Sequence, residues 1–475
     1  MNPRLLLTTL ALLIQSTLLA QNAWQIKVTL KPFTSGYLFL AHHYGSKQML
    51  VDSAAIDKNS QAVFQGKEKL AGGIYMIVFP KKDGWIEVIL DKEQNFTLTA
   101  DSADLIRSMT VTGSNDNLLF KDYLLYSQKY GSEMNELQKQ YKAATTKADS
   151  ARLETQLQAK SKELKIYRDK FIIDHPQHLL SSVFKVFREP VIPPDMTDQV
   201  ARNQYYRRLY WDSMDLNDER LIRTPVLQSK YDRFFDDIVP PVPDTLIMEV
   251  DELMLRVRAN EEMKKYTLLH LTDKYVNPKY MGQDKVFVHM FTKYYIPGDA
   301  DAWLNEKYRK FIFDRGYSLM MNVIGEKAAN INMVDTSGKK KTLYEVVSPY
   351  TVVCFWDPGC SHCQVEVPKL DSLYKNKWRS KGVQMFGVMT DGGLDKWKAY
   401  IREHNLNNWI HVYQTQELKD NELKSGQPGF RQLYDVYQTP MLYLLDKDKK
   451  ILAKKLNYEQ LNEFLDHKFN STSPK

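Results

Sequence analysis

The most informative segment of the sequence is Tyr350-Thr-Val-Val-Cys-Phe-Trp-Asp-Pro-Gly-Cys-Ser-His-Cys-Gln-Val-Glu-Val-Pro368. Its first seven residues, Tyr350 to Trp356, are mostly apolar or β-branched, which indicates a buried central strand. The Asp-Pro-Gly sequence ends this strand, and a helix is expected to open at Cys360. There the free backbone N–H groups and the positive end of the helix dipole favour a thiolate. Cys363 follows on the same helix face, close enough for a short disulfide.

A second apolar run lies further along the chain, where Gln438-Thr-Pro-Met441 leads into residues 441–445. A proline at this point suits a cis peptide that faces the cysteines. A trans proline at the start of a strand is the alternative. If cis, Pro440 places the Thr439 backbone beside Cys360, where an extended substrate segment can pair by strand addition.

These features together are typical of the thioredoxin fold, and the stretch resembles the TlpA/ResA-like thiol–disulfide oxidoreductases of bacterial envelopes. Members of that family carry Phe-Trp before a CxxC motif, a glutamate three residues after its second cysteine, and a proline two residues later. The corresponding residues here are Phe355, Trp356, Glu366 and Pro368. The resemblance extends over residues 322–470, which alternate between strand and helix patterns as a thioredoxin fold does.

Disulfide exchange needs a thiolate nucleophile, a second thiol that resolves the mixed disulfide, and a route for the proton of that second thiol. Cys360 is the expected nucleophile, and Cys363, one turn further in, is the expected resolving thiol. In the resembled family, the glutamate that corresponds to Glu366 influences the cysteine pKa values, so we expect it to handle protons. An exposed helix carboxylate is the alternative. The expected substrate-binding residues are Thr439, Pro440 and Trp356.

Two positions depart from the family pattern. His362 stands where many relatives have proline, and its imidazolium would stabilise the Cys360 thiolate and make the disulfide more oxidising. Oxidising periplasmic enzymes of this fold also have histidine there, which weakens a simple assignment as a reductase. Gly359 replaces the tryptophan that usually precedes the first cysteine. A zinc site of Cys360, His362 and Cys363 is disfavoured, because adjacent ligands have poor geometry. Cys354 is expected to be a buried, inert thiol.

The composition is that of an ordinary globular chain with more than one domain. The chain has 475 residues, 43% of them hydrophobic and 26% charged, which argues against disorder. The net charge of +7 is spread out, and the compact basic clusters at 339–341 and 447–455 have the pattern of turns beside strands. Nucleic-acid binding is therefore not expected. Three cysteines suit a catalytic pair and one buried thiol better than a disulfide-stapled secreted protein.

The N-terminal residues predict export. Arg4 precedes an apolar stretch, Leu5 to Leu19, which ends at Ala20-Gln21 in the pattern of a secretory signal. Cleavage after Ala20 is expected, and an uncleaved anchor is the alternative. No other segment is long and apolar enough to span a membrane. The expected location is the periplasm or the cell envelope.

The patterns divide the rest of the chain into three domains. Alternating short segments predict a β-sandwich, and 50–54, 73–75 and 113–117 resemble a β-domain found ahead of thioredoxin domains in exported Bacteroidetes proteins. A 3/4 spacing of apolar residues then predicts helices that begin with an antiparallel hairpin. In the last domain a helix is expected over Gly429 to Tyr437. The expected order is a signal peptide at 1–20, an all-β sandwich at 24–115, an α-helical domain at 116–320 and an α/β thioredoxin fold at 322–470.

The expected activity is dithiol–disulfide exchange with protein substrates, without a cofactor. Reduction is favoured over oxidation or isomerisation, with a membrane electron donor restoring the dithiol. The alternative is an envelope binding or assembly protein, in which the first two-thirds of the chain engages a partner and the last domain senses redox state. The sequence identifies neither the substrate nor the oligomeric state.

Overall fold

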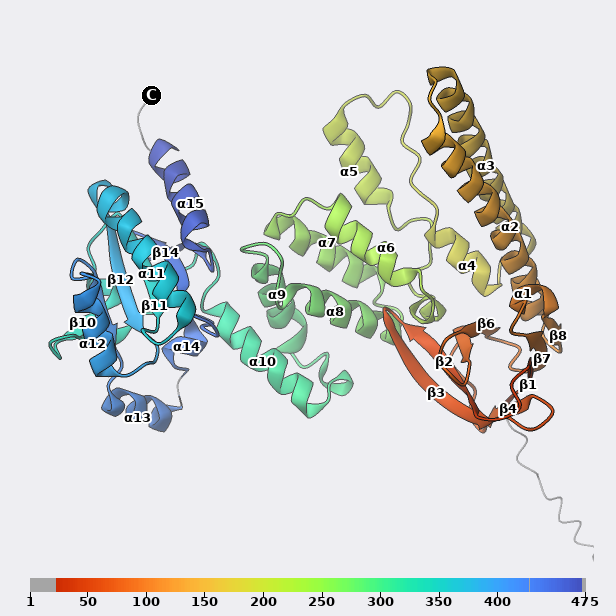
Figure 1. The fold of residues 1–475 in the computed structure, drawn as a ribbon, viewed down its shortest axis with the longest axis horizontal. Helices are drawn as coiled ribbons and strands as arrows, with labels where there is room; N and C mark the ends of the chain where they lie inside the picture. Colours follow the sequence, from red (N-terminus) through yellow and green to blue (C-terminus); the bar gives the residue numbers. More distant parts are fainter. Residues whose placement is uncertain (1–22, 427, 472–475) are drawn as a thin grey trace, which may run out of the picture. The chain divides into compact units, whose positions relative to one another are not determined.

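The computed structural model describes residues 23–426 and 428–471, which form two compact units (Figure 1). Within the described residues, unit 1 holds 23–238 and 256–263, and unit 2 holds 239–255 and 264–471. The expected signal peptide at 1–20 lies outside the described residues. Across the described ranges, no helix combines the length and the apolar character that a membrane crossing requires.

Unit 1 begins with the predicted β-sandwich. One sheet has the strand order β4-β1-β7-β8, and the other has the order β3-β2-β5-β6. The strands are β1 (Trp24–Lys31), β2 (Tyr37–Tyr44), β3 (Lys47–Ala55), β4 (Gln61–Gly66), β5 (Gly73–Val78), β6 (Trp85–Leu90), β7 (Asn95–Asp101) and β8 (Thr110–Thr112).

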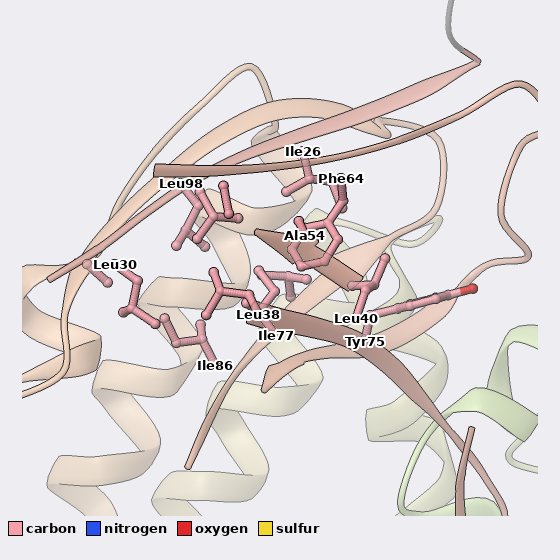
Figure 2. Close-up of a cluster of buried hydrophobic side chains, with 14 of the residues drawn as sticks. Ile26, Leu30, Leu38, Leu40, Ala54, Phe64, Tyr75, Ile77, Ile86 and Leu98 are labelled. Carbon is pink, nitrogen blue, oxygen red and sulfur yellow. The ribbon is translucent and has the colours of Figure 1, made fainter. Parts of the chain in front are cut away.

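The core of the sandwich follows from the alternation of its strands. Every second side chain of β1 is buried, and β7 repeats this pattern. Figure 2 shows Ile26 and Leu98 of one sheet facing Leu38 and Ile77 of the other. Each of these side chains is fully buried, and burying one aliphatic side chain of this size stabilises the fold by roughly 1.5–3 kcal/mol.

Helices follow the sandwich. The predicted antiparallel hairpin consists of α2 and α3, whose Tyr126 and Tyr167 rings stack with centroids 3.9 Å apart. Tyr126 of α2 therefore packs within the hairpin. Asn117, in the first turn of α2, ties this helix to the sandwich, because its side chain accepts from the Ile89 N–H and donates to the Ile89 carbonyl, both at 2.8 Å. The helices of unit 1 are α1 (Leu105–Ser108), α2 (Asn115–Ala143), α3 (Lys147–Asp174), α4 (Leu179–Val186), α5 (Gln199–Leu209) and α6 (Leu227–Arg233).

Unit 2 contains further helices and the thioredoxin-like domain. Its seven-stranded sheet has the order β10-β9-β13-β12-β11-β14-β15. The strands are β9 (Asn332–Asp335), β10 (Lys340–Thr342), β11 (Tyr350–Trp356), β12 (Val383–Met389), β13 (Ile410–Tyr413), β14 (Met441–Asp446) and β15 (Ile451–Lys454). The helices are α7 (Pro243–Arg256), α8 (Glu261–Tyr275, which begins in unit 1), α9 (Asp284–Met290), α10 (Glu306–Met320), α11 (Ser361–Leu373), α12 (Leu394–Glu403), α13 (Gln416–Ser425), α14 (Phe430–Leu433) and α15 (Tyr458–Ser471).

Strand β11 is a buried interior strand of this sheet, as predicted, and lies next to the middle strand β12. It runs parallel to β12 and antiparallel to β14, and its residues from 351 to 356 are all buried. A strand buried on both faces needs an unbroken apolar run, which is what residues 350–356 provide. The hydrophobic side chains of β11 divide between two cores, one on each face of the sheet.

The helix expected over Gly429 to Tyr437 is wrong beyond Leu433. Helix α14 covers only Phe430–Leu433, and the chain then enters a loop that reaches β14. Asp435 adopts a φ of 51°, a left-handed conformation that ends a helix. Its carboxylate is buried in ion pairs with Arg315 and Lys455, contacts that the local sequence pattern does not reveal.

The Asn117 contact predicts a stability effect in unit 1. Replacing Asn117 by alanine leaves the buried Ile89 N–H and carbonyl without their side-chain partner, so the free energy of unfolding should fall by about 2–4 kcal/mol. Urea unfolding of the full chain, followed by circular dichroism, measures this change. Asn115→Ala is the matched control, because Asn115 is exposed in the same helical turn and should alter stability little. Equal effects of the two substitutions would contradict the role of Asn117.

Candidate active site

The two cysteines sit where strand β11 gives way to helix α11. The intervening turn is held by the Asp357 carboxylate, which accepts from the Gly359 N–H at 2.7 Å, and by the Cys360 N–H, which donates to the Asp357 carbonyl at 3.2 Å. Cys360 is the N-cap residue of α11 and has extended backbone angles. Its sulfur therefore lies at the helix end whose N–H groups are free to stabilise negative charge.

Cys360 has the features of a nucleophile. It is half-buried, and its thiol donates to the Thr439 carbonyl at 3.3 Å. Burial opposes ionisation, but hydrogen bonds from the Thr439 side chain, from Cys363 and from the His362 backbone outweigh it, so the pKa of Cys360 is lowered. A lowered pKa increases the thiolate fraction at neutral pH.

Cys363 has the opposite environment. It is 1% exposed, and the Asp357 N–H approaches its sulfur at 3.5 Å. Burial raises the pKa of the Cys363 thiol to about 12, despite this hydrogen bond. Cys363 therefore stays protonated until a base removes its proton, which is the behaviour expected of a resolving thiol.

The Thr439–Pro440 peptide bond is cis, which confirms the expectation drawn from the sequence. Both residues are half-buried. Because Phe355 pairs with Met441 in the antiparallel β11–β14 ladder, the residues just before Met441 lie opposite the end of β11. The tertiary structure thus brings Thr439 to Cys360 across a long stretch of sequence.

The other predicted site residues occupy different environments. His362 is exposed on the first turn of α11, and Glu366 is half-buried one turn beyond Cys363. Cys354 is fully buried, as predicted, and burial, together with the charges of Cys363 and Glu366, raises its pKa well above the usual range. Glu366 therefore lies near enough to act electrostatically on the buried Cys354 thiol.

Trp356 lies away from the surface. It is fully buried, and its ring packs against Tyr400 and His411 at centroid distances of 5.3 and 6.0 Å. A direct contact with a substrate, which the sequence suggested, is not open to this side chain in the structure. The physical reason is its place on a strand that is covered on both faces. Trp356 instead forms part of the packed layer that also contains Cys363.

Two neighbours of the cysteines were not found from the sequence. Asp357 shapes the turn and directs its N–H at Cys363, and the Asp-Pro-Gly sequence was a signal for it. Tyr400 lies on α12, and its hydroxyl is buried without a hydrogen-bond partner among the described residues. Burial, followed by the charge of Cys363, raises the pKa of Tyr400. No local pattern connects Tyr400 with the cysteines.

A groove of about 840 Å³ opens near this site. Phe430, on its wall, stacks on Phe355 of β11, and Arg431 donates to the Thr390 carbonyl at 2.7 Å. Gly392, in the same β12–α12 loop as Thr390, lies against the Asp357 carboxylate, because a Cβ at this position would be 2.4 Å from it. The groove therefore borders the turn that presents Cys360.

The described parts of the chain contain no group of three or more His, Cys, Asp or Glu side chains that converge as metal ligands. Cys360, His362 and Cys363 accordingly do not form such a group.

Comparison with known proteins assigns the three regions separately. Residues 324–454 match the AhpC/TSA family, 132–314 match a domain of unknown function named DUF5106, and 24–120 match a domain of unknown function named DUF4369. The thiol–disulfide oxidoreductase ResA of Bacillus thuringiensis subsp. konkukian is 27% identical over 145 residues, which are 30% of this chain and 76% of that protein. ResA of Bacillus anthracis is 25% identical over 151 residues, 32% of this chain and 79% of that protein.

Two solved structures are also similar. A domain of a possible thiol-disulfide isomerase from Cytophaga hutchinsonii is 38% identical, and the match covers 31% of this chain and 95% of that one with a TM-score of 0.27. A thioredoxin-like protein from Bacteroides caccae is 22% identical, and the match covers 59% of this chain and 98% of that one with a TM-score of 0.46.

The sheet, the dithiol at the strand–helix junction and the facing proline loop define a thioredoxin-fold protein. With the family match, residues 324–454 form a thioredoxin-like domain that is similar to the ResA thiol–disulfide oxidoreductases. Ahead of its oxidoreductase domain it carries a β-domain and a helical region of unknown function.

The different environments of the cysteines predict their reactivity. In the reduced protein at neutral pH, iodoacetamide should modify Cys360 first and leave Cys363 and Cys354 largely unmodified, because only Cys360 combines access with a lowered pKa. As pH rises, Cys360 should reach its full rate below the pKa of an ordinary cysteine, whereas Cys363 should still be protonated there. Peptide mapping after timed quenching measures each site. In guanidinium all three thiols should react alike, and equal reactivity in the native protein would contradict the assignment.

Proposed function

We propose that the chain exchanges the Cys360–Cys363 dithiol with disulfides of protein substrates, and that it acts as a reductase in the periplasm or cell envelope. The observation that carries this proposal is the pairing of an accessible thiol of lowered pKa with a buried thiol of raised pKa. Two thiols that differ in this way suit the successive roles of nucleophile and resolving thiol. The apolar residues at 5–19 support the location.

The reaction would proceed in two exchanges. The Cys360 thiolate attacks one sulfur of the substrate disulfide, a mixed disulfide forms, and the other substrate sulfur leaves as a thiolate and takes up a proton. Cys363 then loses its proton and attacks the Cys360 sulfur. The second substrate thiol is released, and Cys360 and Cys363 are left as a disulfide. Two electrons have passed to the substrate, and a membrane dithiol donor would return them.

The resolving step needs a base, because Cys363 is protonated at neutral pH. We assign this role to Glu366, which is half-buried one turn along the same helix and acts electrostatically on Cys354. His362 would stabilise the Cys360 thiolate through its charge. The Thr439 carbonyl is held beside the Cys360 sulfur, which supports a role for the 439–440 peptide in pairing with an extended substrate segment.

An oxidase or isomerase is the second candidate, and His362 is the residue that favours it, since an imidazolium beside the nucleophile makes the disulfide more oxidising. An envelope binding protein with a redox-sensing domain is the candidate from a different class. The direction of electron flow separates the first two, and mixed-disulfide capture separates an exchanger from a sensor.

Capture of substrates tests the exchange. In a Cys363→Ser variant the mixed disulfide cannot be resolved, so Cys360 should hold substrate proteins in complexes that dithiothreitol releases. Non-reducing electrophoresis of envelope extracts, with mass spectrometry of the released chains, measures this capture. Cys360→Ser should capture nothing, and Cys354→Ala should behave as the unaltered chain. Equal partner association in the Cys360→Ser variant would support the binding-protein alternative instead.

The reduction potential of the Cys360–Cys363 pair tests the direction. Equilibration with dithiothreitol or glutathione buffers, followed by thiol counting, should give a value near that of thioredoxin, about −270 mV. A value near about −120 mV, that of a strong oxidant, would mean that His362 dominates and that the protein oxidises its substrates. The absence of any reversible couple would contradict the exchange reaction itself.

A further inference from the structure

The segment that joins the helical region to the oxidoreductase domain contacts the loop that carries Thr439. The family models match residues 132–314 and 324–454, so the end of α10 and the residues that follow it fall between them. Three side chains of this segment, Arg315, Ser318 and Asn322, reach the chain between α14 and β14. They are spaced three and four residues apart and so lie on one side of the helical path.

Asp435 is the main contact. Its side chain is 1% exposed, and its two carboxylate oxygens pair with Arg315 and Lys455. The Arg315 guanidinium also donates to the Val276 carbonyl and the Asn277 side chain, both at 3.1 Å. A buried carboxylate is tolerated only with partners of this kind. Arg315 thus joins the helical part of unit 2 to the loop.

Two hydrogen bonds hold the preceding turn. The Ser318 hydroxyl donates to the Gln432 carbonyl, and the Asn322 amide donates to the Leu433 carbonyl at 3.2 Å. These carbonyls belong to the end of α14, and the Gln432 carbonyl also accepts from the Asp435 N–H at 3.2 Å. Residues 432 and 433 at the end of α14, and Asp435 at the start of the loop, are therefore held by one segment.

The loop that begins at Asp435 runs to Thr439, which lies beside the nucleophile Cys360. Only three residues separate Asp435 from Thr439, whose carbonyl accepts from the Cys360 thiol at 3.3 Å. Beyond Pro440, β14 pairs with β11, which fixes the other end of the loop. Tyr437, between these fixed points, is 72% exposed, and its ring centroid lies 5.6 Å from the Arg315 guanidinium. The loop thus presents the Thr439 backbone to Cys360 and carries an exposed aromatic ring two residues earlier.

We propose that Arg315, supported by Ser318, is a positioning residue for disulfide exchange: it sets the 435–440 loop so that Tyr437 and the Thr439 backbone receive an extended segment of a protein substrate. This inference rests on the proposed exchange reaction. It assigns to the end of α10 a part in protein-substrate recognition, beside its part in packing. Arg315 contacts neither the reacting sulfur atoms nor the substrate, and it acts through the loop.

The distinguishing consequence is a dependence on substrate size. A small disulfide needs only the Cys360 thiolate, whereas a protein disulfide must also fit against the loop. In the full chain, Arg315→Met should slow the reduction of insulin by about tenfold to a hundredfold, because a small displacement of a positioning group has an effect of this size. The reaction with dipyridyl disulfide should change by less than about twofold, because the thiolate itself is intact.

The experiment compares second-order rates for both disulfides, together with the pH dependence of Cys360 alkylation. Arg309→Met is the matched control, because Arg309 lies on the same helix in an exposed ion pair with Asp301 and should leave both rates unchanged. Arg315→Lys should recover part of the insulin rate. Ser318→Ala removes one contact without exposing a charge, so it decides the question if Arg315→Met fails to fold. It should slow insulin reduction selectively.

Unchanged insulin rates in the folded variants would overturn the inference. Equal losses with both disulfides would also overturn it, since Arg315 would then support the site as a whole rather than substrate recognition. Failure of the exchange reaction is a separate outcome. In that case the unaltered chain would reduce neither disulfide, and Cys363→Ser would capture no substrate.

Discussion

The register between β11 and β14 is the constraint on which the site depends. Phe355 pairs with Met441, so the peptide that ends at Pro440 lies against the turn from which α11 begins. A slip of one residue would turn each side chain of a strand to the opposite face. The buried cores on both faces of β11 prevent such a slip. Packing of an apolar strand therefore fixes the contact between Cys360 and Thr439.

This geometry gives the sulfur atoms of Cys360 and Cys363 different roles in disulfide exchange. Cys360, at the helix end, is partly open to solvent and has a lowered pKa, whereas burial raises that of Cys363. The same backbone thus prepares one thiol for attack and keeps the other protonated until it is needed. The site is also connected to α10, because the Asp435 carboxylate pairs with Arg315 of that helix. A buried carboxylate needs an oppositely charged partner, and here the partner comes from a distant part of the chain.

Structural elements that depend on residues close together in the chain are predicted well from the sequence. The strand at 350–356, the helix that opens at Cys360 and the antiparallel helical hairpin follow from the period of apolar side chains and from turn-forming residues. Apart from the approach of Thr439 to Cys360, contacts between distant residues are not predicted from the sequence. The helix expected over 429–437 stops at Leu433, because Asp435 takes a left-handed conformation within its buried ion pairs. Trp356 was assigned to substrate binding, although the layers that cover β11 bury it completely.

The fold class, the position of the dithiol and the identity of its proline partner can be inferred from the sequence alone, because each is marked by its own short local motif. Three features depend on the folded chain: how far each thiol is buried, the approach of Tyr400 to Cys363, and the contact of Arg315 with the loop before β14. Burial and pairing of charges are properties of groups brought together from distant segments. No local pattern of residues specifies them, since the free energy of a buried group depends on all the neighbours that exclude water from it.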